Sequence, residues 1–226
     1  MAAKLSKKEL KQPDAFQSTV EVIMNYISEN KTRFYAIVTA VIVSAVITFG
    51  IYMYWSYYQS SAREMYAKAR NDIARNIGNP DAVRINIKIF KDLIAKYPHS
   101  WSARMSHYHL GNLYYSIGEV DNAITEYKKF VSSSRSDKAG VKFLALTSLG
   151  YCYEAKQDFQ VALEYYEKAQ KSDNVGFESI GFRNIARAYE QLKDKKNALE
   201  NYKKALQKTS DPSVKVFINR KISFLS

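Results

Sequence analysis

The stretch LGYCYEAKQDFQVALEYYEKA, residues 149–169, decides the fold because its pattern occurs three times in the chain. A Leu-Gly pair stands three positions before a tyrosine, and the pattern Ala-x-x-x-Tyr follows. The same order returns in residues 110–127 and, with Ile-Ala in place of Leu-Gly, in residues 185–205. The small residue and the following alanine are 12 positions apart in every copy. Such constant spacing indicates a repeated structural unit.

This pattern resembles the tetratricopeptide repeat, a helix–turn–helix unit of about 34 residues with L-G-x-x-Y followed by A-x-x-x-F/Y. The two helices of a unit must cross closely, so small residues are expected at the crossing. Those predicted at the crossing are Gly111, Gly150 and Ala186 on first helices, with Ala123, Ala162 and Ala198 facing them. Stacked units of this kind bury one continuous core. The resemblance therefore predicts an all-α superhelix.

The repeats extend in both directions from residues 110–205. Before them, Ile73-Ala74 followed by Phe90-x-x-Leu93 indicates a degenerate unit without the glycine. We therefore expect residues 56–100 to form a linker helix and a degenerate first repeat. Residues 101–226 are expected to hold the tetratricopeptide repeats and a C-terminal capping helix. The apolar residues expected to cover the open end are Val216, Ile218, Ile222 and Leu225.

Residues 34–55, FYAIVTAVIVSAVITFGIYMYW, are apolar throughout, and no charged residue lies between Arg33 and Arg63. A helix needs about 20 such residues to cross the hydrocarbon core of a bilayer. Aromatic residues at both ends suit the headgroup regions. The sequence therefore predicts one transmembrane helix over residues 34–55, which acts as a signal anchor.

Residues 1–33 form the arm that precedes this span, and they are expected to be cytoplasmic and amphipathic. Their length disfavours a cleaved signal peptide, whose apolar region would also be shorter than this one. Six Lys and Arg residues precede the span, whereas four follow it within about 20 positions. This bias places the N-terminus in the cytoplasm and the large C-terminal part across the membrane.

The formal net charge is +12, and the part before residue 59 holds six basic and four acidic residues, which leaves +10 for the rest. Charges alternate in sign along the helices, as on solvated helix faces, so we expect no nucleic-acid partner. No catalytic motif occurs. Cys152 is the single cysteine, and the cluster His99, His107 and His109 lacks further ligands at suitable spacing. The sequence thus predicts no enzyme, no metal site and no cofactor.

The first helices of tetratricopeptide-like units line the concave face of the superhelix. Carrying over the groove positions of the repeat gives Tyr108, Asn112 and Tyr115; Thr147, Tyr151 and Glu154; and Arg183, Arg187 and Glu190. Tyrosine rings and charged side chains suit peptide segments, because they offer apolar surface and charge-assisted hydrogen bonds. These nine residues are the predicted peptide-binding groove. The alternative is that they form a solvated inner face.

Three segments together resemble a known family: FQSTVEVIMNYISENKTRF before the span, YMYW at its end, and FINRKISFLS at the C-terminus. The chain is similar to the YfgM-like inner-membrane proteins of bacteria. This resemblance implies an ancillary subunit of the Sec translocon that faces the periplasm, works with a PpiD-like chaperone and assists newly exported polypeptides. The alternative is an envelope assembly scaffold that binds one fixed protein partner through the repeat groove.

Overall fold

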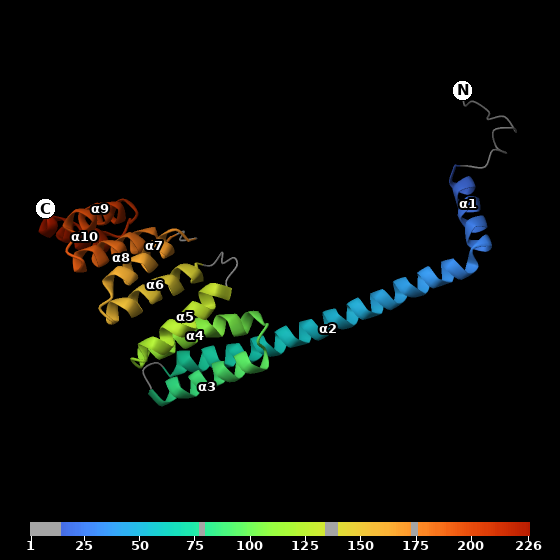
Figure 1. Cartoon of the computed structure of the whole chain (residues 1–226), viewed down its shortest axis with the longest axis horizontal. Helices are drawn as coiled ribbons and strands as arrows, with labels where there is room; N and C mark the ends of the chain where they lie inside the picture. The colour runs from blue at the N-terminus through green and yellow to red at the C-terminus, as the bar shows by residue number, and fades with distance from the viewer. Residues whose placement is uncertain (1–14, 77–79, 134–139, 173–175) are drawn as a thin grey trace, which may run out of the picture. The chain divides into compact units, whose positions relative to one another are not determined.

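The computed structural model describes residues 15–76, 80–133, 140–172 and 176–226. Within these ranges the regular structure is helical, which confirms the all-α prediction (Figure 1). The chain separates into two compact units, Met1–Tyr57 and Tyr58–Ser226. The helices are α1 (Ala15–Glu29), α2 (Lys31–Arg75), α3 (Pro80–Lys96), α4 (Trp101–Ser116), α5 (Val120–Ser133), α6 (Val141–Ala155), α7 (Phe159–Gln170), α8 (Glu178–Gln191), α9 (Lys195–Gln207) and α10 (Pro212–Leu225).

Helix α2 is one continuous helix of 45 residues. It contains an apolar window with a mean hydropathy of 2.3, none of which is buried against protein. Its C-terminal part, in contrast, buries Ala62, Tyr66 and Ala69. The helix is long and apolar enough to be a single membrane anchor or a signal sequence. The expected divisions after residues 33, 55 and 100 stay predictions, and the first 14 residues of the arm lie outside the described part.

In the larger unit, helices pair in chain order (Figure 1). The pairs α4–α5, α6–α7 and α8–α9 have the most extensive contacts, and each second helix also packs on the next first helix. These pairs coincide with the three copies of the sequence pattern. The stacking buries a core that one pair alone could not form.

The close crossing of the helices is confirmed in two of the three pairs, at Gly111 and Gly150. A Cβ atom built on Gly111 would lie 2.5 Å from a ring carbon of Tyr127, and one on Gly150 would lie 2.6 Å from two ring carbons of Tyr166. Both distances are too short for carbon atoms. The glycine therefore gives the tyrosine of the second helix its place in the core.

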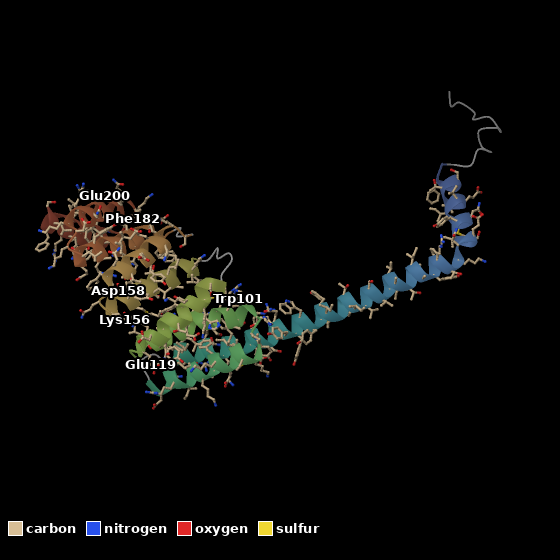
Figure 2. The ribbon with its side chains drawn as sticks, viewed as in Figure 1. Trp101, Glu119, Lys156, Asp158, Phe182 and Glu200 are labelled. Atoms are coloured by element: carbon tan, nitrogen blue, oxygen red, sulfur yellow. The ribbon has the colours of Figure 1, made fainter. Side chains whose placement is uncertain are left out.

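The turn between the two helices has the same geometry in each copy. The residues with positive φ angles are Gly118 at 79°, Gln157 at 60° and Lys193 at 62°. In each copy, the next backbone amide donates to the carbonyl of the tyrosine in the L-G-x-x-Y pattern, at 2.9 Å. In the second copy, Asp158 then caps α7 by accepting from the amide of Val161 at 3.2 Å (Figure 2). This shared turn explains the constant spacing of 12 residues.

Two predicted packing positions are wrong. Ala74 is exposed, whereas Ile73 beside it packs against the core and Ala69 is fully buried, so Ala69 and not Ala74 is the small packed residue of this helix. On α10, Ile218 is fully buried but Val216 is 62% exposed. Residues two apart on a helix point about 200° apart, so Val216 cannot share the packed face of Ile218.

Cys152 on α6 is fully buried, and burial raises the pKa of its thiol from 9.0 to about 12. Because the thiolate is the reactive form, its fraction at neutral pH falls by about a thousandfold. We expect no measurable reaction of the native protein with Ellman's reagent, and one reactive thiol per chain after denaturation. Rapid reaction of the native protein would contradict the packing of α6.

Candidate protein-binding surface

The predicted groove residues follow the first helices of successive pairs, with three residues on each of α4, α6 and α8. Within a helix they are spaced by three or four positions and so share one face. The helices α4 and α6 also contact each other directly. We call these nine residues the first-helix face.

On α4, two of the three residues hold the helix pair together. The ring of Tyr108 packs against those of Tyr127 and Phe130, with centroid distances of 6.1 and 5.7 Å. The Tyr127 hydroxyl donates to the side-chain oxygen of Asn112 at 2.6 Å. Tyr115, in contrast, is 41% exposed. It is therefore the α4 residue of this face that is best placed to meet a partner.

The structure brings Tyr151 and Glu154 of α6 together with Arg187 of α8. Arg187 donates to Glu154 twice, from Nε at 3.1 Å and from Nη2 at 2.9 Å. Its guanidinium also lies 5.2 Å from the ring centroid of Tyr151 and donates to the hydroxyl of Tyr166 at 3.2 Å. We call Tyr151, Glu154, Tyr166 and Arg187 the Arg187 cluster. It joins two successive pairs.

Electrostatics hold the Arg187 cluster in one charge state. Burial alone would lower the pKa of Arg187, but hydrogen bonding and attraction to Glu154 outweigh it, so the pKa is raised. Burial raises the pKa of the Tyr166 phenol, and the nearby charge of Glu154 adds to the effect. Arg187 therefore stays protonated and the Tyr166 phenol stays neutral over the physiological pH range.

Glu190 likewise joins helices, here α8 to the last two helices of the superhelix. It accepts from Lys221 of α10 at 2.9 and 3.1 Å and from the Tyr202 hydroxyl of α9 at 3.0 Å. This contact fixes the capping helix over the last pair. Glu190 is therefore already engaged in holding the domain together.

Thr147 Oγ1 on α6 and Arg183 Nε and Asn184 Nδ2 on α8 are buried without a hydrogen-bond partner among the described residues, as are Asn86 Oδ1 on α3 and Ser102 Oγ on α4. The other side-chain atom of Asn184, Oδ1, accepts from the Tyr151 hydroxyl at 3.2 Å. Most buried polar groups are paired, so unpaired ones are uncommon. Sequence reasoning missed Asn184, although a polar residue one position from the predicted Arg183 was a usable signal.

The histidines of α4 both contact neighbouring helices. His107 Nδ1 lies 2.6 Å from the Glu126 carboxylate of α5. His109 Nε2 lies 2.7 Å from the Tyr66 hydroxyl of α2, and its ring stacks on Phe90 of α3. In the part of the chain that the structure describes, no group of three or more His, Cys, Asp and Glu side chains could hold a metal ion.

The packing of His109 predicts a pH dependence. Burial, assisted by the charge of Arg70, lowers the His109 pKa from 6.5 to about 4. Between these values the unfolded chain binds a proton that the folded chain does not, so stability falls as the pH falls. We expect His109 to cost about 2 kcal/mol of unfolding free energy between about pH 7.5 and pH 5. The variant His109→Gln should lose less stability than the parent over the same range in urea unfolding; equal losses would contradict this assignment.

Comparison with known proteins agrees with this architecture. The stacked helix pairs define a tetratricopeptide-type protein. The family model described as a tetratricopeptide repeat-like domain matches residues 31–226, and the chain therefore belongs to this family. Such domains mediate protein–protein interactions and are typically non-catalytic. No curated protein matches the sequence.

Two solved structures illustrate the shared fold. The crystal structure of MamA is 24% identical with a TM-score of 0.54, and the alignment covers 65% of this chain and 77% of MamA. The nearly identical repeats of a kinesin light chain from Podosopora anserina are 16% identical with a TM-score of 0.57. That alignment covers 74% of this chain and 86% of the other. At these identities the similarity concerns the fold alone.

Proposed function

We propose that this chain is a single-pass protein of the bacterial inner membrane whose repeat domain binds proteins in the periplasm. The observation that carries the proposal is that α2 holds an unburied apolar window and, further along, buries Ala62, Tyr66 and Ala69 in the repeat domain. One helix thus supplies both the anchor and the first helix of the superhelix. The excess of Lys and Arg before the span favours a cytoplasmic N-terminus.

We place protein binding on the first-helix face. Tyr115 offers an exposed aromatic ring on this face. Arg187 is already neutralised by Glu154. This surface therefore favours ring contacts over capture of a terminal carboxylate.

The resemblance to the YfgM-like proteins supplies the partners. In this proposal the chain is an ancillary subunit of the Sec translocon and acts beside a PpiD-like periplasmic chaperone. It holds newly exported polypeptides as they emerge, and it brings the chaperone to them. This is binding and adaptor work without bond chemistry, in agreement with a tetratricopeptide repeat-like domain.

The sidedness can be tested with single cysteines. Cys152 is buried and is replaced by alanine, and one cysteine is introduced at Lys208, an exposed residue just after α9, or at Lys7 of the arm. In cells with a permeabilised outer membrane, we expect a membrane-impermeant maleimide to label the Lys208→Cys variant. The Lys7→Cys variant should react after the inner membrane is dissolved. The opposite result would overturn the proposed orientation, and labelling of both in intact spheroplasts would overturn the anchor.

A further inference from the structure

Helix α1 has two faces of opposite character. Phe16, Val20, Ile23 and Ile27 recur at intervals of four, three and four and so form one stripe. Glu21, Asn25 and Ser28 lie on the opposite face. Such a pattern is found where a helix rests on an apolar surface with its polar side in water.

Among the described residues, three of the four side chains of the apolar stripe are exposed, and Ile27 is half-buried. Phe16 is 75% exposed, Ile23 is 52% exposed and Val20 is 41% exposed. A helix that leaves most of its apolar face in water is unfavourable, because each large apolar side chain gains about 1.5–3 kcal/mol on burial. The stripe therefore calls for an apolar surface other than the residues that the structure describes.

Chain connectivity identifies that surface. Helix α1 ends at Glu29, and the uncharged span of α2 begins at Phe34, five residues later. The chain bends at Asn30, between the two helices (Figure 1). Five residues of helix extend about 7.5 Å, so when α2 spans a bilayer, α1 starts within the headgroup layer. The nearest apolar medium for the stripe is then the same bilayer.

The charged residues of α1 indicate whether its contact with the membrane is electrostatic or apolar. The charged residues of α1 are Glu21 and Glu29, and both are acidic. The cations Lys31 and Arg33 lie on α2, beside the span. An acidic helix gains nothing from anionic lipid, so its contact must rest on apolar side chains. Binding should then be as good on zwitterionic as on anionic lipid.

We propose that α1 lies in the headgroup layer of the membrane, along the bilayer surface, with its Phe16–Val20–Ile23–Ile27 stripe facing the acyl chains. The inference rests on the proposed anchor, since α2 must span the bilayer to hold α1 there. Helix α1 is thus bound at the membrane surface beside the anchor, and it holds the arm at the cytoplasmic face of the membrane. It occupies membrane surface and leaves the polar face, with Glu21 and Asn25, open to water.

The test uses the full chain in nanodiscs, with Cys152→Ala and a single spin-labelled cysteine. The stripe position is Ile23→Cys, the matched polar position is Asn25→Cys, and Val46→Cys reports on the span. We expect the label at position 23 to lie about 5–10 Å deep, accessible to oxygen and shielded from a water-soluble nickel reagent. The label at position 25 should be open to the nickel reagent. Both results should be the same in phosphatidylcholine with and without phosphatidylglycerol.

Each other outcome has a separate meaning. If the label at position 46 lies in lipid but the label at position 23 lies in water, α2 is an anchor but α1 does not lie in the membrane, which would overturn the inference. A label at position 46 in water would overturn the anchor itself. Shielding of position 23 from both oxygen and nickel would show a second protein copy over the stripe, which also contradicts the inference.

Discussion

Replacement of Gly150 by valine should lower the unfolding free energy of the repeat domain by about 3 kcal/mol. Any Cβ atom at this position would lie within 2.6 Å of ring carbons of Tyr166. The ring cannot move away cheaply, because it is fully buried and its hydroxyl accepts from Arg187. The new side chain must therefore push α6 and α7 apart.

Urea unfolding in mild detergent, followed by far-UV circular dichroism, measures this change. Gly50→Val is the matched control, since a Cβ atom at Gly50 would meet nothing within 4 Å among the described residues. The control should unfold at the parent midpoint. A Gly150→Val protein with the parent midpoint would contradict the close crossing of α6 and α7.

Replacement of Arg187 by methionine should cost about 2–3 kcal/mol, less than for a fully buried pair because the Arg187 side chain is 37% exposed. Methionine keeps the length of the side chain but leaves Glu154, 18% exposed, without its cation. The charge of Glu154 would then lie beside Tyr166 in a partly desolvated place. The further change Glu154→Gln should restore much of the loss, since it removes the unpaired charge.

The double-mutant cycle on Arg187 and Glu154 separates pairing from packing. A coupling of about 1–2 kcal/mol is expected. As a control, Lys204→Met breaks the exposed pair of Lys204 and Glu200 on α9 and should leave the unfolding midpoint unchanged. If Arg187→Met behaves like Lys204→Met, the Arg187 cluster does not join the repeats in solution.

The sequence predicted the repeats well because their pattern is local. Gly111 and Gly150 mark the helix crossings, and the fixed spacing follows from the shared turn at Gly118, Gln157 and Lys193. The packed face of the first unit was harder to predict. There the glycine is missing, so the sequence indicated Ala74 where the structure buries Ala69.

The sequence could not predict which residues of the first-helix face are paired with one another and which are exposed. Position in the repeat gave Glu154, Arg187 and Glu190 as residues of a groove. It did not show that Arg187 binds Glu154 or that Glu190 binds Lys221, because each contact joins residues about 30 positions apart. Such pairing depends on how successive units stack. The same stacking decides that Tyr115 is exposed and that Asn184 is buried.

The central claim is that the anchored repeat domain binds export partners through its first-helix face, and in-cell photocrosslinking tests it most directly. A photoreactive amino acid replaces Tyr115, and a second variant carries it at Phe217 on α10, which is 47% exposed and lies outside that face. We predict crosslinks from position 115 to translocon subunits, a PpiD-like chaperone and exported polypeptides, and few from position 217. Position 115 crosslinked to one stoichiometric partner outside the translocon would support an envelope scaffold instead. Equal crosslinking at both positions, or none at 115, would contradict binding through the first-helix face.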